Sequence, residues 1–340
     1  MSWPSFWLKA DWRSRLLTPL SQMVCWWARR RLERFRQTRP QSPGLVIVVG
    51  NVVVGGSGKT PFIQWLGHQL KARGLSYGVI SRGYGGQAKA WPQIVTPDSP
   101  PGLVGDEPVL IAQSLDCPVV VSPKRAEALD LMLSRFDVDV VISDDGLQHY
   151  ALARDIELVL LDSARANNGL GNGLCLPAGP LREPAKRLNE VDFVVFNGDQ
   201  PSWFEFSPPA IGQMQLKPDY FYALNQPGKR FDIHKFAGQA VYAMAGIGNP
   251  ARFYETLQVL GVKVEPLNFS DHHAYRLEDF KSLDPQKPVL MTVKDAVKCQ
   301  KFAADNWWAL EVEPECSDPF AQNLLNHISR HPKLKHKAST

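Results

Sequence analysis

Short apolar runs alternate with segments of helical periodicity along most of the chain. Residues 45–49 form an apolar β-branched run, and residues 62–73 place apolar side chains at helical spacing after a glycine-rich turn. Further strands are predicted at residues 76–81, 118–121, 138–143, 156–161 and 191–196, with a helix at 124–136. This alternation predicts a mostly parallel sheet with helices on both faces, whose ligands bind beyond the carboxyl ends of the strands.

A second alternating block follows a break in this pattern. Proline and aromatic residues accumulate between residues 201 and 228, where we expect a linker containing a short extended pair around 214–216 and 221–224. Asn249-Pro250 then predicts a helix start, with an N-cap followed by proline at the first helical position. The other predicted elements of this block are strands at 241–245, 262–267 and 289–292, and helices at 277–282 and 295–303.

The amino-terminal segment has a pattern of its own, with apolar residues at helical spacing over 16–28 and arginines as far as residue 36. Residues 1–40 hold nine Lys and Arg against two Asp and Glu, a net charge of +7; the whole chain carries +4, so the remainder carries −3. The uncharged run is too short to span a bilayer, and no signal-peptidase site follows it.

Tryptophan and arginine on one amphipathic helix favour the headgroup boundary of an anionic membrane. A helix docked on the protein's own body is the alternative. A nucleic-acid arm is disfavoured because the body offers no matching basic face.

Composition indicates a globular protein, with 44% hydrophobic and 21% charged residues, and a length of 340 residues that suits two domains. Five cysteines lack the spacing of a metal site, so we expect reduced thiols in a cytosolic compartment. They are Cys25, Cys117, Cys175, Cys299 and Cys316.

The turn after the first predicted strand has the composition of a phosphate-binding loop. Its glycines allow backbone N–H groups to converge on an anion at a helix amino terminus. Lys59 would reach the outer phosphates, and the Thr60 hydroxyl would ligate Mg²⁺. Val53 occupies a position where the usual pattern has glycine. The predicted nucleotide-binding residues are Val53, Val54, Gly55, Gly56, Ser57, Gly58, Lys59 and Thr60.

Asp144 and Asp145 follow the buried strand at 138–143, as a Walker B pair that holds Mg²⁺ would. Gln148 and His149 extend this site with polar side chains after Gly146. The glycine-rich loop after another strand supplies Arg82, which would face the transferred group.

Two further motifs are weak when they stand alone. Asp106 and Glu107 fit the first turn of a helix, and His272 and His273 fit a solvated pair before another helix.

Together these motifs resemble the tetraacyldisaccharide 4′-kinase family, the lipid A kinases of Gram-negative bacteria. The similarity runs from about residue 10 to 325. The motifs are Gly50-Asn51, Gly55-Gly56-Ser57-Gly58-Lys59-Thr60-Pro61, Ser81-Arg82-Gly83-Tyr84-Gly85, Gly105-Asp106-Glu107, Asp144-Asp145-Gly146-Leu147-Gln148-His149, Pro177-Ala178-Gly179-Pro180-Leu181-Arg182-Glu183, Ala245-Gly246-Ile247-Gly248-Asn249-Pro250, Asp271-His272-His273 and Lys294-Asp295-Ala296-Val297-Lys298.

The resemblance implies ATP-dependent phosphorylation of the 4′-hydroxyl of a lipid A disaccharide 1-phosphate at the cytoplasmic face of the inner membrane. Separately, we expect a monomer. The family also lacks the first Walker glycine, so Val53 does not weaken the assignment. It has an amino-terminal helix that meets the bilayer.

The resemblance also implies roles for individual residues. Asp106 and His272 would be a catalytic pair from opposite domains, with Asp106 accepting the hydroxyl proton; adjacent His273 is a rival to His272. Lys59 and Arg82 would offset charge on the transferring phosphoryl. Supporting roles in Mg²⁺ binding and in the surrounding site fall to Thr60, Asp145, Asp144, Gln148, His149, Arg182 and Glu183. Val293 stands where many relatives have glutamate, which leaves the role of the region around Lys294 open.

We therefore predict an α/β fold: a P-loop NTPase-like domain with a mostly parallel sheet, a smaller α/β/α domain and an amino-terminal amphipathic helix. The expected parts are the membrane-surface helix at 1–40, the nucleotide-binding domain at 41–205, an extended linker at 206–232 and the smaller domain at 233–330.

Two other functions also use a phosphate-binding loop. A P-loop GTPase or metallochaperone-type switch would need a guanine-reading motif, and residues 292–295 have the wrong spacing for one. A non-enzymatic, membrane-docked nucleotide-binding module would not need the set of Lys59, Thr60, Asp145 and Asp106. We expect no nucleic-acid partner.

Overall fold

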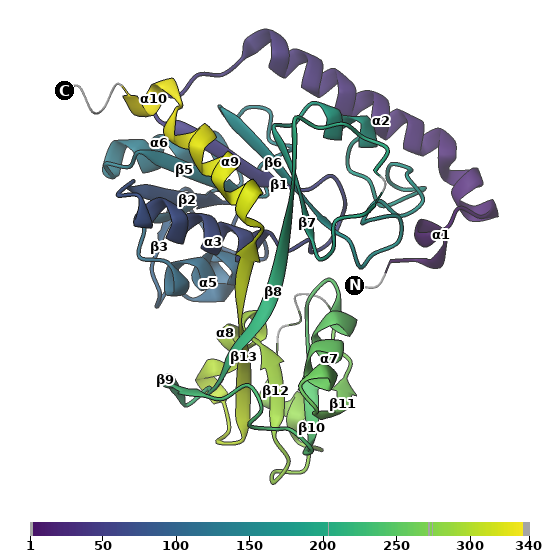
Figure 1. Cartoon of the computed structure of the whole chain (residues 1–340), viewed down its shortest axis with the longest axis vertical. Coiled ribbons are helices and arrows are strands. Elements are labelled where there is room, and N and C mark those ends of the chain that lie inside the picture. Colours follow the sequence, from purple (N-terminus) through teal and green to yellow (C-terminus); the bar gives the residue numbers. More distant parts are fainter. Residues whose placement is uncertain (1–2, 203, 271–272, 274, 336–340) are drawn as a thin grey trace.

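One mixed, mostly parallel sheet of 13 strands organises the part of the chain that the computed structural model describes, which is residues 3–202, 204–270, 273 and 275–335 (Figure 1). The strand order is β11-β10-β12-β13-β8-β7-β6-β1-β5-β2-β4-β3, with β9 paired to β8. The predicted α/β class is therefore confirmed.

The strands are β1 (Leu45–Gly50), β2 (Tyr77–Ser81), β3 (Gln93–Val95), β4 (Val119–Val121), β5 (Val140–Asp144), β6 (Ile156–Asp162), β7 (Phe193–Asn197), β8 (Ala210–Ala223), β9 (Gln226–Phe231), β10 (Ala240–Met244), β11 (Lys263–Leu267), β12 (Val289–Thr292) and β13 (Trp307–Cys316). The α-helices are α1 (Ser5–Leu8), α2 (Trp12–Thr38), α3 (Lys59–Ala72), α4 (Pro101–Val104), α5 (Asp106–Ser114), α6 (Arg125–Arg135), α7 (Pro250–Val259), α8 (Val293–Cys299), α9 (Asp318–Ser329) and α10 (Pro332–Lys335). Three 3₁₀ segments are η1 (Ala185–Asn189), η2 (Leu277–Phe280) and η3 (Gln300–Phe302).

The large lobe comprises β1 to β7 with their helices. Its central strand, β1, is buried on both faces: Leu45 and Ile47 lie in one core with α3, α5 and α9, whereas Val46 and Val48 lie in a second core with α6. A parallel strand covered on both faces carries an unbroken apolar run, which is why this segment was recognisable in the sequence.

The small lobe comprises β10, β11 and β12 with α7 and α8. Its strands are parallel, and Val241 and Leu290 belong to a core separate from the two cores of the large lobe. Two long antiparallel strands, β8 and β13, run from one lobe into the other (Figure 1). The two short extended segments that were predicted at 214–216 and 221–224 both belong to β8, which is a single strand of 14 residues. The proposed boundaries of the linker at 206 and 232 stay a prediction.

Helix α9 returns the chain to the large lobe. Phe320 stacks with Trp65 of α3 at a centroid distance of 6.3 Å, and Leu324 and Leu325 are buried in the same core. The buried apolar residues described in α9 therefore pack in the core of the large lobe. The proposed boundaries of the smaller domain at 233 and 330 stay a prediction. Nothing in the local periodicity of the sequence could have assigned the helix to either lobe.

The amino-terminal helix α2 has two different faces. Its body-facing side is narrow and built from Ser14, Ser21 and Ala28, which recur every seven residues and are buried. Its other side exposes six large apolar side chains. This exposed stripe consists of Trp12, Leu16, Leu20, Met23, Trp26 and Trp27. Both ideas weighed from the sequence therefore have support, since the helix docks on the body and still presents an apolar surface.

Trp3 and Trp7, which precede α2, attach the amino-terminal segment to the large lobe through hydrogen bonds. The Trp3 indole donates to the Val54 carbonyl at 3.1 Å, and the Trp7 indole donates to the Pro177 carbonyl at 2.9 Å. Within the described ranges, no helix has both the length and the apolar character needed to cross a membrane.

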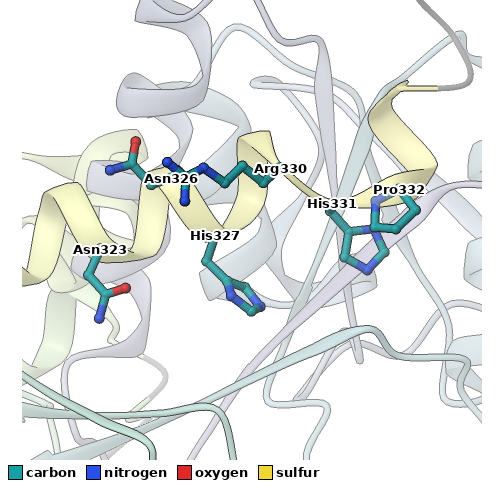
Figure 2. A pocket seen from close by; sticks show the side chains of 6 residues that line it. All are labelled: Asn323, Asn326, His327, Arg330, His331 and Pro332. Atoms are coloured by element: carbon teal, nitrogen blue, oxygen red, sulfur yellow. The ribbon is translucent and has the colours of Figure 1, made fainter.

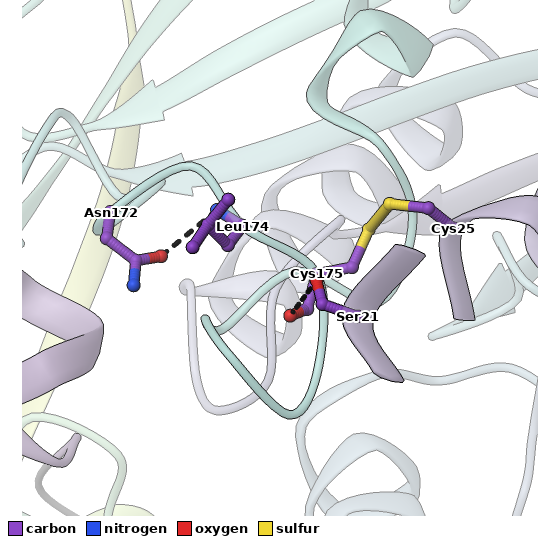
Figure 3. Close-up of a disulfide and its surroundings, with 5 residues drawn as sticks. All are labelled: Ser21, Cys25, Asn172, Leu174 and Cys175. Atoms are coloured by element: carbon purple, nitrogen blue, oxygen red, sulfur yellow. Dashed lines mark hydrogen bonds between the residues drawn. A yellow bond between two sulfur atoms is a disulfide. The ribbon is translucent and has the colours of Figure 1, made fainter. Parts of the chain in front are cut away.

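One cysteine expectation is wrong, because Cys25 of α2 and Cys175 form a disulfide (Figure 3). One turn earlier on α2, Ser21 donates to the Cys175 carbonyl at 2.8 Å. The two cysteines are 150 residues apart, so their spacing carried no sign that the fold brings them together. Cys117, Cys299 and Cys316 are free thiols.

Candidate active site

The phosphate-binding loop is shaped by two glycines in the left-handed region, Gly55 with φ 100° and Gly58 with φ 91°. A Cβ on Gly58 would lie 2.4 Å from the Asn197 amide nitrogen, so the position has no room for a side chain. Asn51 holds the loop from inside by donating to the Gly55 carbonyl at 3.0 Å, and α3 begins at Lys59. The backbone amides of residues 55–60 thus lie at a helix amino terminus, as an anion site requires.

Val53 occupies the place of the missing Walker glycine for a structural reason. Its side chain is buried in the large-lobe core, and its backbone bridges to Leu181. The residue therefore anchors the loop to the segment that carries Arg182.

Asp144 and Asp145 lie beside the loop because β5 pairs with β1, with Asp144 in register with Val49. The Lys59 ammonium is 3.4 Å from Asp145 Oδ1, and the Arg182 guanidinium is 2.9 Å from Asp145 Oδ2. Burial would raise the pKa of Asp145, but Lys59 and Arg182 outweigh it and hold that pKa below its usual range. Asp145 is therefore ionised at neutral pH.

The Asp144 carboxyl points into the protein. Ser81 Oγ, at the end of β2, donates to Asp144 Oδ2 at 3.0 Å. Burial raises the pKa of Asp144 to about 7, with the Glu107 charge adding to the effect and Lys59 opposing it. Its Oδ1 is buried and accepts no hydrogen bond from the described residues.

These oxygens fit a magnesium ion. Among the described residues, no three His, Cys, Asp or Glu side chains converge as a metal site of their own. Mg²⁺ is instead commonly bound by one or two carboxylates together with substrate phosphates and water. The buried Asp144 Oδ1 without a partner, the ionised Asp145 and the Thr60 hydroxyl next to Lys59 supply that kind of donor set.

Gln148, Arg182 and Glu183 form a connected layer behind Asp145. The Gln148 amide donates to Glu183 Oε1 at 2.8 Å and to the Asn51 carbonyl at 3.0 Å, while Arg182 donates to Gln148 Oε1 at 3.3 Å. The Tyr150 hydroxyl donates to Glu183 Oε2. The structure thus brings together these predicted supporting residues, and Tyr150 joins them as a residue that the sequence did not single out.

His149 and Arg82 lie on the cationic side of the site. Burial, and then the nearby Arg125 and Arg82 charges, lower the pKa of His149 to about 4, so this imidazole is neutral at pH 7. Arg82 follows β2 and has an exposed side chain, whereas Arg125 is almost fully buried and donates to the Asp144 carbonyl at 3.2 Å. The sequence analysis did not single out Arg125 as a site residue, because its local pattern indicates only the first turn of a helix.

Asp106 begins α5 directly after Gly105. Gly105 has φ 96°, and a Cβ there would lie 2.8 Å from the Tyr84 carbonyl oxygen, so only glycine lets the helix start this close to the Arg82 loop. Across the lobes, the Lys298 ammonium is 3.2 Å from Asp106 Oδ2.

The histidine assigned to the catalytic pair, His272, lies outside the described residues. Its neighbour His273 has its Nε2 at 3.0 Å from Asp279 Oδ2 and packs against Phe269 and Tyr275 in the small lobe. The choice between His272 and His273 as the partner of Asp106 stays a prediction.

A second contact between the lobes lies at the phosphate-binding loop itself. A Cβ on Gly248 would come within 2.6 Å of the Gly56 nitrogen, so the two loops touch. Arg165 donates to the Gly248 carbonyl at 2.8 Å, and the Asn249 amide contacts Asp162 Oδ2 at 3.4 Å. The sequence analysis recognised the motif at 245–250 but did not single out Arg165 and Asp162, which contact it.

Two surface cavities lie away from these residues. One of about 340 Å³ is lined by six residues of α9 and the segment leading into α10 (Figure 2). The other, of about 910 Å³, is bordered by α3, α5, β8, β13 and the side of α8 that carries Val293 and Val297. Neither cavity contains a predicted site residue, so the candidate active site is defined by its charged groups and loops.

The fold and the phosphate-binding loop together define a two-lobed protein of the P-loop NTPase-like class. The chain matches the family described as tetraacyldisaccharide-1-P 4′-kinase over residues 13–329. It is 53% identical over 336 residues to the tetraacyldisaccharide 4′-kinase of Hydrogenovibrio crunogenus, covering 97% of this chain and 99% of the relative. It is 47% identical over 336 residues to that of Alkalilimnicola ehrlichii, covering 96% and 97%.

Among solved structures, the chain is similar to LpxK from Aquifex aeolicus in complex with ATP. The TM-score is 0.76 at 29% identity, and the match covers 93% of this chain and 99% of that one. The chain belongs to the tetraacyldisaccharide 4′-kinase family.

Proposed function

We propose that the chain transfers the γ-phosphate of ATP to the 4′-hydroxyl of a tetraacyldisaccharide 1-phosphate, a step of lipid A synthesis. The observation that most supports this function is the approach of Lys59 to Asp145, which unites the phosphate-binding loop with the acidic end of β5 in a member of this kinase family.

In this proposal the loop binds the nucleotide by its phosphates. Backbone amides of residues 55–60 and the amino terminus of α3 attract the negative charge. Lys59 and Arg82 offset the charge that develops on the transferring phosphoryl group. Gly248, against Gly56, helps to exclude water from the donor when the lobes are together.

The acceptor oxygen attacks the γ-phosphorus while the bond to the β,γ-bridging oxygen breaks, and ADP leaves. Asp106 takes the proton of the 4′-hydroxyl, and His272 is proposed to orient this carboxylate. Arg182 and Gln148 keep Asp145 in place. Thr60, Asp145 and Asp144 would hold Mg²⁺, which when bound neutralises charge on the β- and γ-phosphate oxygens.

The transfer is tested by incubating the protein with γ-labelled ATP, Mg²⁺ and a tetraacyldisaccharide 1-phosphate in detergent micelles, then separating lipids from inorganic phosphate. Label on the 4′ position of the lipid is the expected result. Label only in inorganic phosphate would instead support a hydrolytic switch and contradict the kinase proposal.

We further propose that α2 attaches the protein peripherally to an anionic membrane, at the cytoplasmic face of the inner membrane where the lipid substrate would lie. Support comes from the exposed stripe on α2 and from the arginines that flank it; Arg30 lies over Trp26 at 5.2 Å from the ring centroid. Aromatic and basic side chains on one helix are suited to the headgroup region.

Replacing Leu16, Leu20 and Met23 together by serine should lower binding to anionic vesicles at least tenfold. Each such side chain contributes roughly 1–2 kcal/mol when it leaves water, and none of the three is buried against the body. Co-sedimentation with vesicles measures the effect. The matched control is Val259→Ser with Leu277→Ser, which removes exposed apolar side chains from the small lobe. Equal vesicle binding by the stripe variant and the control would contradict membrane attachment through α2.

A further inference from the structure

Two acids at the start of α5 face two lysines on α8 across the lobe boundary. Lys298 Nζ is 3.2 Å from Asp106 Oδ2, and Lys294 Nζ is 3.0 Å from Glu107 Oε1. The two helices pack against each other, so these pairs are part of a direct helix contact between the lobes. Neither lysine has a place in the phosphate-binding or metal-binding set described above.

The Lys298–Asp106 pair is largely shielded from water, since each side chain is only 10% exposed. The Lys298 ammonium makes no well-aligned hydrogen bond to a described residue, but it lies near the carboxylates of Asp106 and Asp295 and over the Tyr275 ring, 5.7 Å from the ring centroid. A buried charge that loses its partner is costly, whereas a pair on the surface contributes little. The orientation of Asp106 is therefore sensitive to where α8 lies.

Lys298 is itself tied into the small lobe through Asp295. The Asp295 carboxylate is fully buried and 4.0 Å from Lys298 Nζ. It accepts hydrogen bonds from Tyr275 Oη at 2.9 Å, from Thr292 Oγ1 at 2.6 Å and from the Gly246 amide at 3.1 Å.

Gly246 opens the same loop whose Gly248 touches the phosphate-binding loop. One network of the small lobe thus reaches both Asp106 and the nucleotide end of the site.

We propose that Lys298 is a positioning residue for phosphoryl transfer: when the lobes meet, its ammonium fixes the Asp106 carboxylate in the direction from which it receives the hydroxyl proton. This inference rests on the proposed function, in which Asp106 is the general base. Before transfer, the ionised Asp106 attracts Lys298 and holds the lobes together. After the 4′ oxygen has bonded to phosphorus, its proton is on Asp106 and the pair has lost one charge, which weakens the lobe contact as product must leave.

The test is a double-mutant cycle of Lys298→Met and Asp106→Asn, measured as lipid phosphorylation. In the wild-type background, Lys298→Met should lower kcat by roughly 10–100-fold, because small misplacements of a reacting group cost up to about 10²-fold. The KM for ATP should stay within about twofold, since the contacts of Lys298 with described side chains are made to Asp106, Asp295 and Tyr275 and not to the phosphate-binding loop. Lys298→Arg should recover most of the loss, and Lys301→Met, on the exposed side of η3, should change neither parameter.

In the Asp106→Asn background, Lys298→Met should change kcat by less than about threefold, because a residue that acts through Asp106 has no further effect once that carboxylate is gone. Equal fold losses in both backgrounds, or a normal kcat for Lys298→Met alone, would overturn the inference. If Lys298→Met melts near the assay temperature, Lys298→Gln replaces it in the same cycle. Absence of any label on lipid with the wild-type protein would instead reject the proposed function, so the two failures are distinct.

Discussion

Lys59→Met is expected to remove nearly all lipid phosphorylation while the protein stays folded. Lys59 begins α3 at the phosphate-binding loop, and its ammonium lies 3.4 Å from Asp145. In the proposed function it offsets the charge that develops during transfer. Loss of one such preorganised group typically lowers kcat by roughly 10²–10³-fold. Methionine keeps the length of the side chain, so the helix start and the loop should be preserved. Steady-state kinetics with γ-labelled ATP measures the change.

The same helix provides the matched control for this substitution. Lys71 lies at the other end of α3, and its ion pair with Asp116 joins side chains that are 60% and 91% exposed. Because exposed pairs contribute little, Lys71→Met should leave kcat and the melting temperature unchanged. Near-normal turnover by Lys59→Met would remove the phosphate-binding assignment.

Asp145→Asn should lower kcat by about 10²-fold or more and shift its Mg²⁺ dependence to higher concentration. Asp145 is an ionised carboxylate that pairs with Lys59 and Arg182. In the proposed function its removal would take a ligand from Mg²⁺ as well as this counter-charge. A metal ion contributes several kcal/mol of transition-state stabilisation, and each 1.36 kcal/mol corresponds to tenfold in rate. Residue 145 has φ 48°, a backbone conformation that asparagine also adopts. A loss of activity in Asp145→Asn would therefore come from the lost negative charge and not from a change in the backbone.

Asp130→Asn, in an exposed position on α6, serves as the control and should behave like the wild type. Mg²⁺ titrations of ATP affinity by fluorescence or calorimetry separate loss of the metal from loss of fold. If Asp145→Asn bound Mg-ATP and turned over at the wild-type rate, the metal role of the paired aspartates would be wrong.

The nucleotide end of the site was predictable because its parts are local or obey one rule of sheet geometry. The loop, Lys59 and the start of α3 are contiguous, and β1 is a run of five apolar residues before a glycine turn. Asp144 joins them because neighbouring parallel strands end at the same edge of a sheet, here in register with Val49. Local sequence and strand order were therefore sufficient for this half of the site.

Other features depended on contacts between distant segments. The strand β13 and the helix α9 were not predicted from the sequence. Phe320 of α9 stacks on Trp65 of α3, although these two residues are far apart in sequence. Arg125 and Tyr150 support the site from positions that read as an ordinary helix start and an ordinary loop. The Cys25–Cys175 bond joins segments 150 residues apart.

The α/β class, the phosphate-binding loop, the acidic pair and the basic, apolar character of the amino-terminal helix follow from the sequence, because composition and short-range spacing encode each of them. The docking of α2 through Ser14, Ser21 and Ala28, and the contact of Lys298 in one lobe with Asp106 in the other, depend on the folded chain. Side chains that lie close together only after folding leave no regular spacing along the chain, so their pairing becomes visible when the sheet and its lobes are assembled.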